Sequence, residues 1–178
     1  MRPSARLKPE MAVADRVFET VARAAVDIRD ALSERRAYSE AENPSGDRQL
    51  DADVYADERL EAQLLDLDGV ASYASEERES VSRAADGGAV HVACDPLDGS
   101  SNLMSNNGMG TILGVFDEPL PTSGDSLAAA GYVCYGPITT MVTAVDGTVT
   151  EYLLEEGERT VLNANVTLPD SPTVYGFG

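Results

Sequence analysis

The most informative stretch of the sequence is Asp95-Pro96-Leu97-Asp98-Gly99-Ser100-Ser101-Asn102. It puts the carboxylates of Asp95 and Asp98 three residues apart and follows them with a turn of small residues. Carboxylates bind hard divalent cations, and the backbone N–H groups of such a turn can bind a phosphate. The stretch therefore predicts metal-assisted chemistry on a phosphate ester.

A second acidic motif lies upstream. Glu76 and Glu77 come just after the apolar run 70–74, and Asp95 directly follows the apolar run 90–94. An acidic turn or a pair of glutamates is by itself most often a solvated surface feature. If the two runs are neighbouring strands, however, their ends bring the carboxylates of Glu76 and Asp95 together. We interpret the combination as a metal site.

The apolar pattern predicts the fold class. Apolar residues repeat at helical spacing over 11–37, which indicates a long amphipathic helix. We expect the polar segment 38–50 to be a loop, and a second helix to begin near Asp53 as its N-cap. Strands are expected at 70–74, 89–94, 109–116, 128–135, 139–145, 148–154 and 160–166. This order predicts an α+β layered fold, with two N-terminal helices packed on a largely antiparallel mixed sheet and no helix on its second face.

Composition narrows the possible partners. The chain has 31 acidic and 13 basic residues, a formal net charge of −18 and a single lysine, Lys8. This balance argues against nucleic acid and against an anionic membrane surface, both of which need basic residues. An acidic substrate would be repelled unless metal ions reversed the local charge. No apolar run approaches the ~20 residues that span a bilayer. We therefore expect a cytoplasmic protein, and the excess of acids is typical of a high-salt cytoplasm.

The stretch 95–102 resembles the signature of class I fructose-1,6-bisphosphatases, members of the metal-dependent sugar phosphatases that include inositol monophosphatases. Other matches are the acidic pair Glu76-Glu77, the run Asp53-Val54-Tyr55-Ala56 and the strand 131–136. Inositol monophosphatases usually have Thr where Ser100 stands, so Ser-Ser-Asn favours the bisphosphatases. The resemblance extends over essentially the whole chain, and it selects Asp53 rather than the nearby Asp51 as the functional aspartate.

The resemblance also implies roles for individual residues. The metal ligands would be Glu76, Asp95, Asp98, the carbonyl of Leu97 and, on a third ion, Asp47. Asp53 and Glu77, helped by Asp47, would activate the attacking water. Asp98, Gly99, Ser100 and Ser101 would bind the phosphate being removed. The implied cofactor is two or three Mg²⁺ ions, with Mn²⁺ or Zn²⁺ as alternatives.

For the whole chain, the resemblance implies an N-terminal metal- and phosphate-binding domain at 1–178, with a mobile loop at 40–52. Family members are usually ~100 residues longer, which is enough for a further, sugar-binding α/β domain that this sequence lacks. The expected reaction is hydrolysis of fructose 1,6-bisphosphate in gluconeogenesis by a homo-oligomer. Inositol-monophosphatase-like or sedoheptulose-bisphosphatase activity, a non-catalytic metal-binding domain, and acids that only adapt the surface to salt remain open as alternatives.

Overall fold

A computed structural model describes residues 9–44, 46 and 48–171 of the chain. Its helices are α1 (Pro9–Ala31) and α2 (Asp51–Leu65), with the short 3-10 helices η1 (Leu32–Glu34), η2 (Ser100–Met104) and η3 (Gly124–Ser126). Its strands are β1 (Tyr38–Glu42), β2 (Arg48–Leu50), β3 (Gly69–Ser75), β4 (Ser82–Arg83), β5 (Gly88–Asp98), β6 (Met109–Phe116), β7 (Leu127–Tyr135), β8 (Thr139–Val145), β9 (Thr148–Glu155) and β10 (Glu158–Asn163). Within this described part, no helix is both long and apolar enough to cross a membrane.

The main sheet has eight strands in the order β10-β9-β8-β7-β6-β5-β3-β4. Every neighbouring pair is antiparallel except β3 and β5, which run parallel. The remaining strands, β1 and β2, form a separate hairpin. The predicted α+β fold with a largely antiparallel mixed sheet is therefore confirmed.

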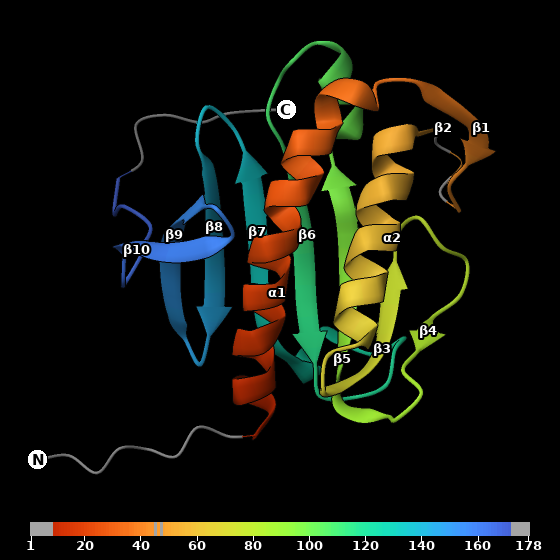
Figure 1. Ribbon diagram of the computed structural model, residues 1–178. Coiled ribbons are helices and arrows are strands. Elements are labelled where there is room, and N and C mark those ends of the chain that lie inside the picture. Colours follow the sequence, from red (N-terminus) through yellow and green to blue (C-terminus); the bar gives the residue numbers. More distant parts are fainter. Residues whose placement is uncertain (1–8, 45, 47, 172–178) are drawn as a thin grey trace, which may run out of the picture.

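Both α-helices lie on the same face of the sheet (Figure 1). The apolar stripe of α1 is buried there, as the helical periodicity predicts, with Val17, Val21 and Ile28 at most 1% exposed. No α-helix follows β3 in the part of the chain that the structure describes. On the opposite face of the sheet, Ile112 of β6 and Tyr132 of β7 are cross-strand partners and remain 47% and 48% exposed.

Three predicted boundaries are wrong. The first helix ends at Ala31, not near residue 37, and passes through η1 into the hairpin. The segment 38–50, predicted as a loop, contains β1 and β2, whose register pairs Tyr38 with Leu50. Helix α2 begins at Asp51 with Leu50 as its N-cap, so Asp53 lies inside the first turn. The strands β1 and β2 pair with each other through their backbones, and the polarity of their side chains does not report that pairing.

The last strand is also displaced from its prediction. It runs over Glu158–Asn163 in place of 160–166 and pairs with β9. The turn before it contains Glu156 and Gly157, both at positive φ, which are the conformations that a tight hairpin turn needs. The Asp146-Gly147 hairpin between β8 and β9 is present as predicted.

Candidate metal- and phosphate-binding site

The parallel pairing of β3 and β5 brings the two acidic motifs together. Its register places Ser75 beside Cys94. The residues that follow these two, Glu76 and Asp95, are therefore neighbours as well. The N–H of Glu76 donates to the carbonyl of Cys94 at 3.1 Å and holds this arrangement beyond the end of β3. The expectation that neighbouring strand ends unite these carboxylates therefore agrees with the structure.

The strand β5 does not end before Asp95 but continues to Asp98. Asp95 pairs with Ile112 and Asp98 with Gly110, so β5 has one residue more than β6 over this interval. Side chains three apart on a regular strand point to opposite faces, and one extra residue removes that alternation. The irregularity explains how two aspartates at this spacing contribute to one site. The N–H of Leu97 donates to Asp95 Oδ1 at 3.2 Å and orients that carboxylate.

The phosphate-type turn begins at Gly99, whose φ of 72° lies in the left-handed region that favours glycine. Its carbonyl accepts the N–H of Asn102 at 2.8 Å, and η2 starts immediately afterwards. The N–H groups of Ser100 and Ser101 belong to the first turn of η2, where a helix supplies no carbonyl partners. These two groups are therefore available to an anion.

Asp53 reaches the site from α2. Its side chain is buried, and Oδ2 accepts the N–H of Leu50 at 2.7 Å. Its other oxygen, Oδ1, is buried and has no hydrogen-bond partner among the residues that the structure describes. Asp51, by contrast, is exposed on the first residue of the helix. Of the two aspartates that the sequence offers, Asp53 is the one at the site.

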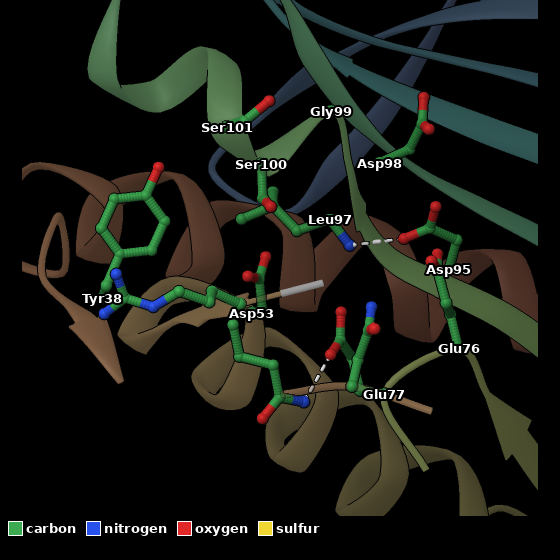
Figure 2. Close-up of a pocket in the computed structure, with 13 residues that line it drawn as sticks. Tyr38, Asp53, Glu76, Glu77, Asp95, Leu97, Asp98, Gly99, Ser100 and Ser101 are labelled. Atoms are coloured by element: carbon green, nitrogen blue, oxygen red, sulfur yellow. Dashed lines mark hydrogen bonds between the residues drawn. The ribbon is translucent and has the colours of Figure 1, made fainter. Parts of the chain in front are cut away.

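These elements enclose a cavity of about 610 Å³. It is lined by Tyr38, Asn43, Arg48, Gln49, Asp53, Glu76, Glu77, Asp95, Leu97, Asp98, Gly99, Ser100 and Ser101. Figure 2 shows these residues converging from the hairpin, from α2 and from the ends of β3 and β5. Nine of the ten residues predicted from the sequence line this cavity, and the tenth, Asp47, lies outside the described residues.

The sequence analysis missed the four hairpin residues in that lining. Gln49 donates from Nε2 to Glu77 Oε2 at 2.5 Å, and the Arg48 guanidinium lies 4.8 Å from the centre of the Tyr38 ring. No local motif marks these residues, because they reach the cavity only through the pairing of β1 with β2. Arg48 is the one basic residue in the described lining, against five acidic residues.

Burial and mutual repulsion raise the pKa values of three of these acids. Burial, the adjacent Glu76 carboxyl and the charge of Asp98 raise the pKa of Asp95 from 3.8 to about 7. Burial also raises the pKa of Glu77, although the hydrogen bond from Gln49 opposes this shift. The pKa of Asp53 is raised by burial, against the stabilising effect of the Leu50 N–H and the Ser100 hydroxyl. Each of these carboxylates would therefore gain from a nearby cation.

The carboxylates that line the cavity are the kind of ligand that a hard divalent cation prefers, but their oxygens do not converge on one point. In Figure 2 the carboxylates of Glu76 and Asp95 lie next to each other, and Asp98 is farther along the strand. Among the described residues, no three His, Cys, Asp or Glu side chains form a ready metal-binding group. The donors are nevertheless all oxygen, which suits Mg²⁺. The Oδ1 of Asp53 is a buried acceptor without a partner in the described part of the chain, so it would be stabilised by a donor or a cation.

Comparison with known proteins identifies the family. The family model described as "Fructose-1-6-bisphosphatase, N-terminal domain" matches residues 12–163. A class 1 fructose-1,6-bisphosphatase of Natronomonas pharaonis is 64% identical over 165 residues, covering 92% of this chain and 58% of the relative. One from Haloarcula marismortui is 54% identical over 162 residues, covering 91% of this chain and 55% of the relative. The chain thus spans little more than half the length of the curated relatives it matches.

Solved structures agree on the fold. The holo form of Leishmania major fructose-1,6-bisphosphatase superposes with a TM-score of 0.83 at 24% identity, over 95% of this chain and 58% of that one. The T-state of the same enzyme gives a TM-score of 0.74 at 23% identity, over 97% of this chain and 57% of that one. On the strength of the family match, which extends from α1 to β10, this chain belongs to the family of the fructose-1,6-bisphosphatase N-terminal domain.

Proposed function

We propose that this chain is the metal- and phosphate-binding part of an enzyme that hydrolyses fructose 1,6-bisphosphate to fructose 6-phosphate and phosphate. The observation that carries the proposal is that nine of the residues predicted from the sequence line one cavity. The names of the class 1 relatives support the choice of substrate. Because those relatives are longer, we propose that the contacts to the sugar come from residues outside this chain.

In this proposal, Glu76, Asp95, Asp98 and the carbonyl of Leu97 hold two or three divalent cations, and Asp47 joins them when the segment 40–52 closes. Bound Mg²⁺ supplies neutralisation of the phosphate charge, activation of a water and stabilisation of the leaving oxygen. Five acids and one arginine line the cavity, so the protein alone would repel a phosphate ester. Cations are therefore required for binding as well as for the reaction.

The remaining residues orient the substrate and accept a proton. The N–H groups of Gly99, Ser100 and Ser101 bind the phosphoryl group through the turn at the start of η2. Glu77 and Asp53, whose pKa values are raised by burial, are suited to accept the proton of the attacking water. Gln49 holds Glu77 through its 2.5 Å hydrogen bond and so keeps that carboxylate directed into the cavity.

Two measurements on the 178-residue chain test the proposal. Calorimetric titration with Mg²⁺ and Mn²⁺ measures metal binding without requiring the sugar contacts. Release of phosphate is then measured from fructose 1,6-bisphosphate, sedoheptulose 1,7-bisphosphate and inositol monophosphate, with and without Mg²⁺. Asp98→Asn and Glu76→Gln are the test variants. Asp170→Asn is the matched control, because Asp170 is exposed and lies far along the chain from the residues that line the cavity.

We expect Asp98→Asn and Glu76→Gln to weaken metal binding by about tenfold or more, and Asp170→Asn to leave it unchanged. Metal-dependent phosphate release that is greatest with fructose 1,6-bisphosphate would establish the substrate. Metal binding without phosphate release by this chain would support the proposed metal site and show that the reaction needs the longer protein. Metal binding that is indifferent to Asp98→Asn and Glu76→Gln would overturn the site.

The cellular context is part of the same proposal. We propose that the enzyme acts in gluconeogenesis in the cytoplasm of a salt-loving organism, and that it is a homo-oligomer. The net charge of −18 and the haloarchaeal sources of the similar proteins support the high-salt setting. Light scattering combined with size-exclusion chromatography measures the oligomeric state directly.

A further inference from the structure

A second cavity, of about 540 Å³, lies between the C-terminal end of α1, η1 and the segment that follows η2. Its polar lining consists of Arg29, Ser33, Arg36, Asn106, Asn107 and Tyr135, and the remaining side chains are apolar. The helix η2 separates it from the first cavity, because Ser100 and Ser101 line the first and Leu103 lines the second. We refer to it below as the arginine cavity.

The charge of the arginine cavity is opposite to that of the molecule. Its described lining contains two arginines and no acidic residue. The chain as a whole carries 31 acids and 13 bases, and the first cavity is lined by five acids and one arginine. Two guanidinium groups facing one cavity without a carboxylate raise the local positive potential and the local concentration of anions.

Both arginines are held in place by neutral acceptors. Arg29 donates from Nη1 to Thr139 Oγ1 at 2.6 Å and from Nη2 to the carbonyls of Gly136 at 3.3 Å and Pro137 at 3.4 Å. Arg36 donates from Nη2 to the carbonyl of Met104 at 3.0 Å. Neither makes an ion pair with any residue that the structure describes. Their charges are thus oriented without a paired carboxylate, and a guanidinium has five N–H donors, more than these bonds use. Arg29 also lines a neighbouring cavity that contains the acids Asp30, Glu155 and Glu156, whereas Arg36 does not.

Other groups in the cavity suit an anionic ligand. Ser33 is exposed on η1 and offers a hydroxyl, and the side-chain amides of Asn106 and Asn107 offer N–H donors. Tyr135 is fixed at the back of the cavity, because its hydroxyl shares a 2.8 Å hydrogen bond with Thr111, which donates to the carbonyl of Pro96 at 2.8 Å. The arginine cavity is therefore built on a rigid wall that belongs to the sheet.

We propose that the arginine cavity binds a small anion bearing a phosphate or a carboxylate group, independently of the metal site. Arginine binds both groups through paired N–H donors, so the cavity selects for a planar carboxylate or a tetrahedral phosphate rather than for a neutral sugar. The ligand would lie beside Arg29 and Arg36 and accept hydrogen bonds from their free N–H groups. This binding needs no divalent cation, which separates it from phosphate binding at Gly99–Ser101.

The test uses two matched charge insertions. Inorganic phosphate and, separately, malonate are titrated into the 178-residue chain in metal-depleted buffer at constant ionic strength, with calorimetry and amide NMR shifts as readouts. Ser33→Asp adds a carboxylate to the arginine cavity, and Ser101→Asp adds one to the other cavity. Both serines are exposed and both variants have the same net charge. Arg36→Gln removes one guanidinium, and Arg83→Gln, an exposed arginine elsewhere, is its control.

We expect phosphate, malonate or both to bind the unmodified chain, with shifts at residues 33, 36, 106 and 107. Ser33→Asp and Arg36→Gln should each weaken that binding by about tenfold or more. Ser101→Asp and Arg83→Gln should leave it unchanged. Preference for phosphate or for malonate then identifies the ligand class. The proposal is overturned if neither anion binds, if Ser101→Asp weakens binding as much as Ser33→Asp, or if Ser33→Asp has no effect. Circular dichroism confirms that each variant is folded.

Discussion

At the scale of single residues, the surroundings of Asp95 disfavour the charged form of its side chain. A carboxylate with an ordinary pKa of 3.8 is partly buried next to Glu76, and its pKa rises to about 7. In the unfolded chain the same group would ionise near its ordinary value. Between these two pH values the unfolded chain binds fewer protons than the folded chain, so folding becomes less favourable as the pH rises.

Asp95→Asn should therefore stabilise the metal-free chain above pH ~7, by about 1–2 kcal/mol after allowance for solvent screening. Below pH ~4 the gain should vanish, because Asp95 is then protonated in both states. Urea unfolding from pH 4 to 8 in metal-depleted buffer measures the difference. The same substitution should abolish the stabilisation that Mg²⁺ confers on the unmodified chain. A destabilised Asp95→Asn at pH 8 would contradict the assigned pKa.

At the scale of elements, one arginine links α2 to the turn that carries the acidic pair. Arg78 follows Glu77 directly and donates from Nε to Asp57 at 2.5 Å and from Nη1 to Glu61 at 2.7 Å. The Tyr73 hydroxyl also donates to Asp57, at 3.1 Å. The Asp57 side chain is only 7% exposed, so its charge depends on these donors. This network anchors the end of β3 against the helix that supplies Asp53.

Arg78→Met should destabilise the chain by about 2–4 kcal/mol, because it leaves the buried Asp57 carboxylate without its cation. The double variant Asp57→Asn with Arg78→Met should recover part of that loss, since no charge is then buried alone. Chemical unfolding of the single and double variants gives the coupling energy between the two residues. Equal stability of Arg78→Met and the unmodified chain would show that the network does not anchor the turn.

Close backbone packing beside the site depends on Gly110 of β6. A Cβ at this position would lie 2.3 Å from the carbonyl oxygen of Val133 on β7, and backbone cannot move aside as a flexible side chain can. Gly110 is also the partner of Asp98 across the irregularity in β5. The absence of a side chain therefore allows β6 to fit between its two neighbours.

Gly110→Ala should reduce the free energy of unfolding by at least about 1–3 kcal/mol, the usual cost of overpacking. Gly124→Ala is the matched control, because a Cβ there meets no atom within 4 Å. Thermal unfolding of both variants, at the same salt concentration, compares the two positions. If both glycines tolerate alanine equally well, the tight β6–β7 contact is not a constraint on the fold.

At the scale of the whole molecule, charge repulsion opposes folding. The formal net charge of −18 is spread over 178 residues, and folding brings those charges closer together. Salt reduces the repulsion, since the screening length falls to about 3 Å at 1 M. Stability should therefore depend strongly on ionic strength.

We expect the unfolding temperature to rise as KCl increases from millimolar to molar concentrations. Substituting the exposed Asp66, Asp86 and Asp170 by Asn should raise stability at low salt and flatten this dependence. Differential scanning calorimetry of the unmodified chain and of this triple variant, at matched salt concentrations, compares their unfolding temperatures. An unfolding temperature that falls as KCl is added would mean that favourable ion pairs, such as Arg159 with Asp15, outweigh the repulsion.

Much of the fold and of the site is readable from local pattern. The apolar repeat of α1, the strand runs and the Asp146-Gly147 turn predict the elements because each depends on a few neighbouring residues. The wrong boundaries are those that side-chain polarity does not mark, namely the polar hairpin of β1 with β2 and the start of α2, where Leu50 and not an aspartate is the N-cap. For the same reason the hairpin residues in the cavity, including Arg48 and Gln49, were not foreseen.

The sequence by itself determined the fold class, the acidic and glycine-serine motifs and the family, because a motif of consecutive residues carries its chemistry wherever the chain places it. Only the tertiary structure decided that β3 and β5 run parallel with Glu76 beside Asp95, that Gln49 reaches Glu77, and that two arginines face a cavity whose described lining has no acid. These features join residues far apart in the chain, and their geometry follows from strand register and helix packing, which the packing of the whole core selects.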